Sequence, residues 1–188
     1  VNAPTGSGKT YSLAVPILLE GLGQKTSKVR ALWITPIRAL SKEIHSAITE
    51  AADGLGSSWK VGVRTGDTRV AEKVRQKEKP PAVLITTPES LHQLLSHKGY
   101  PEYFSELDAV VVDEWHELMG SKRGVQMELA LSRLKALRPG LKIWGISATI
   151  GNMDQSLEVL LGADERKREY TVVRSDIRKE VEIISVFP

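Results

Sequence analysis

The chain has 188 residues, of which 41% are hydrophobic and 26% are charged, and its formal net charge is +3 at pH 7. That length suits one α/β domain, no apolar run approaches the roughly 20 residues that span a bilayer, and the charge is too small to identify a partner. Because the chain has no cysteine, it cannot form disulfides or thiolate metal sites, and we expect a cytoplasmic protein without a membrane partner.

Short apolar, β-branched runs alternate with longer amphipathic segments along the chain. Runs of this length with near-continuous hydrophobic residues are typical of strands that are covered on both faces. The predicted strands are 29–35, 59–65, 82–86, 109–112 and 141–147, and the predicted helices are 9–22, 38–52, 68–78, 88–96 and 125–137. This alternation predicts an α/β fold with a parallel sheet and helices on both sides.

The last of these predicted helices carries an apolar stripe that we expect to face the core. The stripe consists of Val125, Leu129 and Leu134, with Met127 and Leu131 beside them. A Pro-Gly pair follows soon after the helix, which is a usual signal for a helix end.

The pattern of strands and helices weakens after residue 150. A short helix at 154–161 and strands at 170–174 and 181–186 are the remaining predictions. We therefore expect one domain at residues 1–174, followed by a linker at 175–188 that leads to a further domain.

The first chemical motif is APTGSGKT at residues 3–10, which fits the phosphate-binding loop except that Ala3 replaces its first glycine. Glycines let such a loop turn its backbone N–H groups inward, and the following helix adds partial positive charge. Lys9 should reach the β- and γ-phosphates of ATP, and the Thr10 hydroxyl should bind Mg²⁺. The predicted nucleotide-binding residues are Thr5, Gly6, Ser7, Gly8, Lys9 and Thr10.

The predicted strand at 109–112 ends on two adjacent carboxylates, Asp113 and Glu114. Adjacent acids repel each other, so a fold gains nothing from them unless they face water or hold a positive charge. Together with Lys9, they match the second phosphate-site motif of P-loop ATPases. Asp113 should hold Mg²⁺, largely through water, and Glu114 should orient and deprotonate the attacking water.

The acidic motif continues as DEWH at residues 113–116, and the sequence SAT follows at 147–149. In this order and spacing, the segments resemble the superfamily 2 helicases and translocases of the DExH type. The resemblance implies a three-layer, RecA-like P-loop NTPase domain with a mainly parallel sheet. It also implies that His116, Ser147, Ala148 and Thr149 couple the phosphate site to the nucleic-acid path, with His116 as part of the catalytic motif.

Three more segments look like further helicase motifs in the expected order: TPIRAL at 35–40 like motif Ia, RTGDT at 64–68 like the element after it, and TTPESL at 86–91 like motif Ib. Each alone is an ordinary turn. Together they follow strands at one sheet edge, where such groups can bind the phosphates of a single strand without reading its bases. The predicted nucleic-acid contacts are Pro36, Arg38, Thr65, Gly66, Thr87, Pro88, Glu89 and Ser90.

The segments VVVDEWHELMGSKRGVQMELALSRL and WGISATIGN resemble the large helicase-related family, and DEWHEL is most like its bacterial ligase-associated DEXH-box branch. This resemblance implies an ATP-driven translocase that moves 3′ to 5′ on single-stranded DNA, unwinds duplexes or hybrids and serves DNA repair. It also implies a second RecA-like domain and a winged helix in the same full-length protein. Because the sequence lacks these parts and the strand before the phosphate loop, we expect a fragment that binds nucleotide weakly and hydrolyses it slowly or not at all.

Several alternatives stay open on the sequence alone. An RNA-directed helicase differs from a DNA-directed one at contacts to the 2′-hydroxyl, which the sequence does not place. A nucleotide-gated binding module needs no water-activating acid, so Glu114 disfavours it, and the three segments after the strands disfavour an ATPase without a nucleic-acid partner. The basic turn GSKRG at 120–124 fits a contact to DNA or to a neighbouring domain and fits a solvated loop equally well.

Overall fold

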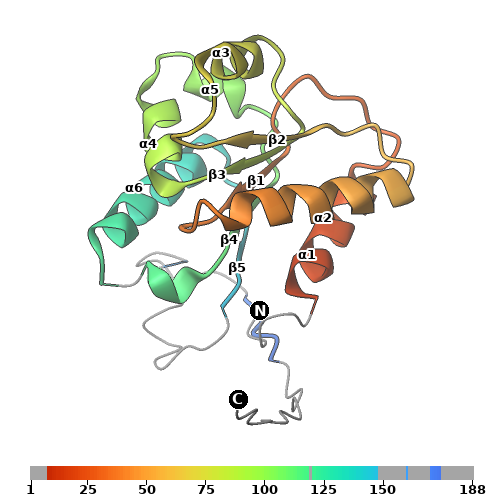
Figure 1. The fold of residues 1–188 in the computed structure, drawn as a ribbon. Helices are drawn as coiled ribbons and strands as arrows, with labels where there is room; N and C mark the ends of the chain where they lie inside the picture. The colour runs from red at the N-terminus through yellow and green to blue at the C-terminus, as the bar shows by residue number, and fades with distance from the viewer. Residues whose placement is uncertain (1–7, 119, 148–159, 161–169, 175–188) are drawn as a thin grey trace, which may run out of the picture.

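The computed structural model describes residues 8–118, 120–147, 160 and 170–174. Its centre is a five-stranded parallel sheet with the strand order β2-β3-β1-β4-β5 (Figure 1). The strands are β1 (Ala31–Ile34), β2 (Val61–Arg64), β3 (Val83–Thr86), β4 (Ala109–Val112) and β5 (Lys142–Gly145). These five predicted strands are therefore confirmed, and all but β4 are shorter than predicted.

Helices cover both faces of this sheet (Figure 1). They are α1 (Lys9–Glu20), α2 (Leu40–Gly54), α3 (Val70–Glu78), α4 (Pro88–Ser96), α5 (Tyr100–Tyr103) and α6 (Lys122–Leu137), with a 3-10 turn η1 (Trp115–Glu117). The sequence predicted all of them except α5 and η1, which are too short to show a period. No helix in the described ranges is long and apolar enough to cross a membrane.

The central strands are buried on both faces, which explains their near-continuous hydrophobic sequences. Every residue of β1 is buried, and Ala31 lies opposite Val83 on one side and Ala109 on the other. Successive side chains of a strand point to opposite faces. Accordingly, Trp33 packs in a core cluster with residues of α1 and α2, whereas Leu32 packs in a second cluster with residues of α4 and α6.

The predicted inward stripe of α6 is partly wrong. Val125 and Leu129 are 57% and 60% exposed, and the buried residues of α6 are Gly124, Met127, Ala130, Leu131 and Leu134. The reason lies at the start of the helix, where a Cβ added to Gly124 would stand 2.1 Å from the carbonyl oxygen of Leu118. Only glycine permits so close an approach, so Gly124 turns its own face of the helix inward and leaves Val125 and Leu129 outside.

The strand predicted at 170–174 is also wrong, because these residues form no strand and only Arg174 makes an isolated bridge. Its sequence favours a strand locally, but a strand also needs pairing of successive backbone groups, and among the described residues of this segment only Arg174 is paired in this way. The helix predicted at 154–161, apart from the helical residue Leu160, and the strand at 181–186 lie outside the described residues, as does the linker predicted at 175–188.

Candidate nucleotide site and nucleic-acid track

Each of the five described strands is followed by a polar motif at one edge of the sheet. Because every strand pair is parallel, the carboxyl ends of the strands meet at the same edge. The residues that leave the strands there are Pro36 after β1, Thr65 after β2, Thr87 after β3, Asp113 after β4 and Ser147 just beyond β5. The structure therefore places predicted nucleotide-site residues and predicted nucleic-acid residues at the same edge of the sheet.

The phosphate loop enters α1 through Gly8, which has φ 80° and ψ 17°. This left-handed conformation strains any residue with a Cβ, so glycine is required at this point. The carbonyl of Gly8 accepts a hydrogen bond from the Ser12 N–H at 3.0 Å, which begins the helix. Thr5, Gly6 and Ser7 lie outside the described residues, so their predicted role stays a prediction, and Thr10 follows Lys9 in the first turn of α1.

Lys9 is the side chain of the candidate nucleotide site that gives the strongest indication of a bound anion. Its Nζ lies 4.0 Å from Oε1 of Glu114, and the two side chains are only 10% and 17% exposed. The Nζ atom is buried and has no hydrogen-bond partner among the described residues. A buried ammonium with unused donors is unfavourable, and phosphate oxygens are the acceptors that best satisfy it.

Asp113 ends β4 and is 7% exposed. Its backbone N–H donates to the Ile34 carbonyl at 2.8 Å, and its Oδ1 accepts a hydrogen bond from the Glu114 N–H at 3.0 Å. Burial, and then the neighbouring Glu114 carboxylate, raise the pKa of Asp113 above its usual value. The positive charge of Lys9 and the Glu114 N–H offset this effect only in part, and a divalent cation is a group that would supply more positive charge.

Mg²⁺ commonly binds through one or two protein oxygens and completes its octahedron with water and substrate phosphates. In the part of the chain that the structure describes, no three His, Asp or Glu side chains gather into a metal site. Asp113 and the Thr10 hydroxyl are the candidate protein ligands.

Glu114 is the only non-glycine residue with a positive φ among the described residues, at φ 45° and ψ 44°. Such a conformation raises the free energy by about 1 kcal/mol or more and concentrates at functional sites. Two backbone bonds hold it: the Trp115 N–H donates to Ile146 at 3.0 Å, and the Glu117 N–H donates to Glu114 at 2.9 Å. The strained turn aims the carboxylate at Lys9 and at His116.

His116 joins the acidic turn to the end of β5. Its Nδ1 lies 2.9 Å from the Ser147 hydroxyl and 3.4 Å from Oε2 of Glu114, and its Nε2 lies 3.4 Å from Oε1 of Glu117. Beneath it Trp115 is buried in the core cluster that includes α6. The structure thus brings the predicted coupling residues His116 and Ser147 into contact, while Ala148 and Thr149 lie outside the described residues.

The predicted nucleic-acid residues differ in exposure. Arg38 and Gly66 are exposed and Glu89 is half-buried. The remaining ones are buried, namely Pro36, Thr65, Thr87, Pro88 and Ser90. The buried hydroxyls shape the turns themselves: the Thr87 side chain caps α4 by accepting from the Ser90 N–H at 3.4 Å, and its hydroxyl donates to Ser90 Oγ at 3.2 Å.

The first two of the three nucleic-acid segments touch each other. Arg38 Nη1 lies 3.3 Å from Oδ1 of Asp67, and both side chains are largely exposed. A Cβ added to Gly66 would stand 3.2 Å from Nη2 of Arg38, so the guanidinium packs close over the Gly66 backbone. This places a cation beside the turn after β2, in reach of solvent.

One contact at this edge was not predicted from the sequence. Arg123, in the basic turn at 120–124, pairs with Glu89 of the third nucleic-acid segment, with Nε 2.5 Å from Oε1. The sequence offered only a weak signal, a basic residue soon after the acidic motif, because a contact between residues 34 positions apart leaves no periodic pattern.

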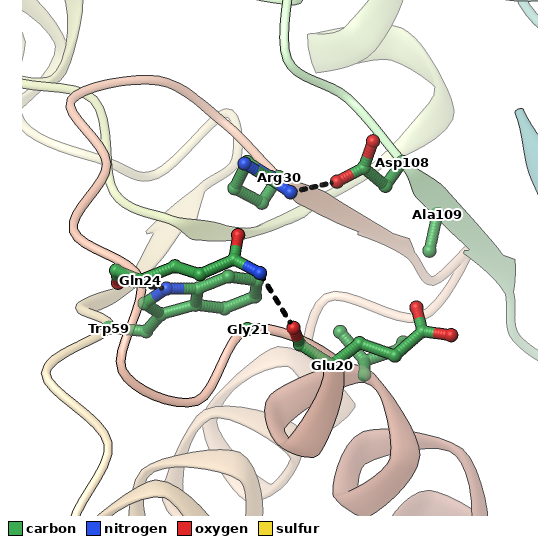
Figure 2. A pocket seen from close by; sticks show the side chains of 8 residues that line it. Glu20, Gly21, Gln24, Arg30, Trp59, Asp108 and Ala109 are labelled. Atoms are coloured by element: carbon green, nitrogen blue, oxygen red, sulfur yellow. Dashed lines mark hydrogen bonds and ion pairs between the residues drawn. The ribbon is translucent and has the colours of Figure 1, made fainter.

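A pocket of about 310 Å³ lies at the opposite edge of the sheet, beside the amino ends of β1 and β4 (Figure 2). Arg30 pairs there with Asp108, and Glu20 pairs with Lys142 outside the pocket at 2.5 Å. The Trp59 indole packs on Gly21, where an added Cβ would stand 1.9 Å from the ring (Figure 2). The charges are paired and the phosphate motifs are remote, so this pocket is not the nucleotide site.

Comparison with known proteins agrees with this geometry. The family described as DEAD/DEAH box helicase matches residues 1–156. The chain is 36% identical to the ATP-dependent helicase Lhr-Core of Methanothermobacter thermautotrophicus over 203 residues, which cover all of this chain and 24% of that protein. It is 34% identical to the Lhr helicase/uracil glycosylase of Escherichia coli over all of this chain and 13% of that protein.

Solved structures show the same fold. The Mycobacterium smegmatis helicase Lhr bound to single-stranded DNA and AMP-PNP matches with a TM-score of 0.72 and 34% identity, covering 85% of this chain and 22% of that chain. The helicase MrfA bound to DNA and AMPPNP matches with a TM-score of 0.73 and 28% identity, covering 85% and 23%. The chain thus spans about a quarter or less of these relatives. The predicted RecA-like helicase fold is confirmed, and three of the four similar proteins named above bear the Lhr name. The chain belongs to the DEAD/DEAH box helicase family.

Proposed function

We propose that this chain is the first RecA-like, ATP-binding domain of a longer ATP-dependent helicase or translocase that acts on single-stranded nucleic acid. The observation that carries the proposal is the buried Lys9 ammonium, which faces Glu114 and has no hydrogen-bond acceptor among the described residues. A γ-phosphate would supply that acceptor. The full-length protein would perform the reaction, because the chain spans only 24% of its Lhr-Core relative.

In the proposed reaction, Lys9 binds the β- and γ-phosphates and the N–H groups at the start of α1 assist it. Thr10 and Asp113 would hold Mg²⁺, which on binding offsets the negative charge of the phosphates and of Asp113. Glu114 orients the attacking water and accepts its proton. The strained turn at Glu114 supports this role, since it keeps the carboxylate beside Lys9 instead of letting it turn into solvent.

His116 and Ser147 would carry the nucleotide state to the rest of the sheet edge. The 2.9 Å contact between them supports this, because any movement of the acidic turn then reaches the end of β5. The second RecA-like domain would complete the ATP site with arginines, which in related ATPases raise the rate by about three orders of magnitude or more. The isolated chain should therefore hydrolyse ATP slowly or not at all.

Single-stranded DNA is the proposed partner. Two related helicases of 34% and 28% identity are described as bound to single-stranded DNA or to DNA together with an ATP analogue. RNA is the second candidate, because the helicase Mss116, which is described as bound to single-stranded RNA, matches the fold with a TM-score of 0.73 at 25% identity. Family resemblance alone supports four further parts of the proposal. These are the 3′ to 5′ direction, a role in DNA repair, membership of the ligase-associated branch and a winged-helix domain.

A strand-displacement assay with the full-length parent protein tests this proposal. Duplexes would carry a single-stranded 3′ or 5′ tail, each made of DNA or of RNA, and release of a labelled strand would be followed with ATP and Mg²⁺. We expect release from the duplex with the 3′ DNA tail, and none with the Lys9→Ala variant. Failure of the parent protein to release a strand from any of the four substrates would contradict the helicase proposal.

A further inference from the structure

The pair Glu89–Arg123 links two helices that begin at the functional edge of the sheet. Glu89 is the second residue of α4 and Arg123 the second residue of α6. Nε of Arg123 lies 2.5 Å from Oε1 of Glu89, and the two side chains are 44% and 38% exposed. The other carboxylate oxygen, Oε2, is buried without a hydrogen-bond partner among the described residues. Glu89 therefore depends on Arg123 for its main charge partner.

Glu89 brings a negative charge to a place where the proposed function needs phosphates to bind. It lies in the first turn of α4, next to Thr87, Pro88 and Ser90 of the same segment. Burial raises the pKa of Glu89, but its own backbone N–H, Arg123 and Thr87 stabilise the carboxylate, so the net pKa lies below the usual value. Glu89 is thus ionised at neutral pH, and without Arg123 it would repel a phosphate at the start of α4.

Arg123 is itself held against the turn that follows the DEWH motif. Its neighbour Gly124 packs so closely that an added Cβ would stand 2.1 Å from the Leu118 carbonyl oxygen. Ser121 reinforces this contact, because its hydroxyl donates to that carbonyl at 2.7 Å and accepts from the Gly124 N–H at 3.1 Å. Leu118 is fully buried. The first turn of α6 therefore has a fixed position relative to the acidic motif.

We propose that Arg123 is a positioning residue for nucleic-acid binding, which neutralises Glu89 and fixes the start of α4 against the turn after the DEWH motif. This role rests on the proposed function. A backbone phosphate can then approach the N-terminus of α4, and Arg123 acts through Glu89 instead of touching the phosphate itself.

The test measures the affinity of the full-length parent protein for a fluorescently labelled single-stranded DNA across a series of salt concentrations. The variants are Arg123→Gln, Arg123→Lys, Glu89→Gln and the double variant Arg123→Gln/Glu89→Gln, each checked by its thermal unfolding midpoint. We expect Arg123→Gln to weaken binding about tenfold at low salt, because an unpaired carboxylate then faces the phosphate. Arg123→Lys keeps the charge and should retain most of the affinity, and Glu89→Gln should bind more tightly than the wild type, because it removes the carboxylate that repels the phosphate.

The double variant decides the role. If Arg123 acts through Glu89, removing both charges restores affinity to within about twofold and leaves the slope of log affinity against log salt unchanged. Should the double variant stay as weak as Arg123→Gln, with the slope reduced by about one, Arg123 contacts a phosphate directly and the positioning role is overturned. Unchanged affinity of Arg123→Gln would overturn it as well. A wild-type protein that binds neither DNA nor RNA would instead reject the proposed function, and this role with it.

Discussion

The functional edge of the sheet has two halves that are built in different ways. The phosphate half consists of Lys9, Asp113, Glu114, His116 and Ser147, and the track half consists of the segments 35–40, 64–68 and 86–91. In the phosphate half, Lys9 has a buried amine without a hydrogen-bond partner among the described residues, the pKa of Asp113 is raised, and Glu114 has a strained backbone. In the track half, most polar groups satisfy one another, as Thr87 does with Ser90 and Arg38 with Asp67, and the exception is Oε2 of Glu89, which is buried without a hydrogen-bond partner among the described residues.

This difference indicates how each half meets its partner. Unsatisfied charge and strain persist in a fold only when the surrounding structure holds them, and a bound ligand can relieve them. The phosphate half therefore has the properties of a site that a small, highly charged ligand completes. The track half is a preformed surface, which fits the proposed function, in which a nucleic acid would bind there and be released repeatedly.

The largest effect should come from the lysine of the phosphate half. We expect Lys9→Ala to lower ATP hydrolysis by the full-length parent protein about a hundredfold or more, because it removes the buried charge that would bind the phosphates in the proposed function. Steady-state hydrolysis of ATP measures this. Lys42→Ala removes a lysine from the exposed face of α2 and should leave the rate within about twofold. A Lys9→Ala protein with wild-type hydrolysis would place the nucleotide site elsewhere.

The opposite edge of the sheet provides a reference, because a substitution there should change the packing and stability of the chain without removing a predicted site residue. We expect Gly21→Ala to lower the free energy of unfolding by about 1–3 kcal/mol, because the new Cβ would stand 1.9 Å from the Trp59 ring. Gly54→Ala introduces the same methyl group where nothing lies within 4 Å, and it should change stability by less than about 0.5 kcal/mol. Denaturant unfolding of the 188-residue chain measures both, and equal effects would contradict the packing of Trp59 on Gly21.

The raised pKa of Asp113 predicts an effect on stability that depends on pH. The folded chain holds the Asp113 proton more tightly than the unfolded chain does, and this difference contributes to the free energy of unfolding. The contribution is fully present below pH 3.8, the ordinary pKa of Asp, and is lost as the pH rises through the pKa of Asp113 in the folded chain. Asp113→Asn stays neutral at every pH. We expect it to stabilise the nucleotide-free chain at pH 7 by on the order of 1 kcal/mol and to make little difference below pH 3.8.

Denaturant unfolding at the two pH values, with Asp53→Asn as a surface control, measures this effect. Asp53 is exposed on α2, so its substitution should change little at either pH. If Asp113→Asn destabilised the chain at pH 7, the carboxylate would be well paired in the folded state. The phosphate half would then not contain the unsatisfied charge that distinguishes it from the track half.

The smallest effect should come from the track half. Arg38→Gln should weaken binding of single-stranded DNA by the full-length parent about threefold, because Arg38 is exposed and shares its charge with Asp67. Lys25→Gln removes one positive charge from an exposed position near the opposite edge and controls for net charge. A loss equal to that of Lys25→Gln would show that the track does not pass Arg38.

The sequence was sufficient for the elements whose pattern is local. The central strands are near-continuous hydrophobic runs, and α4 begins and ends at the predicted residues because Thr87 caps it and Pro88 fits its first turn. The placement of the motifs at one edge follows from the parallel strand order, so the sequence could predict it as well.

Features that depend on contacts distant in sequence were beyond such prediction. The α6 sequence offers two apolar faces, and only the approach of Gly124 to Leu118 decides that Val125 and Leu129 stay outside. The pairing of Glu89 with Arg123 joins the first turns of two helices that lie far apart in the sequence, and no periodic pattern predicts it. The positive φ of Glu114 accompanies a hydrogen bond from the Trp115 N–H to the carbonyl of Ile146, the residue that follows β5. A contact between residues so far apart cannot be predicted from the glutamate itself.

In the proposed function, the two halves work together as a nucleic-acid-stimulated ATPase. The decisive experiment measures ATP hydrolysis by the full-length parent protein, with and without single-stranded DNA or RNA, next to the Glu114→Gln variant. We predict strong stimulation by DNA that the substitution abolishes while ATP binding persists, because in the proposed function Glu114 would activate water and would not hold the phosphates. Two results would contradict a nucleic-acid-stimulated ATPase with Glu114 as its water-activating acid. One is nucleotide binding without stimulation by either polymer, and the other is stimulated hydrolysis that survives in Glu114→Gln.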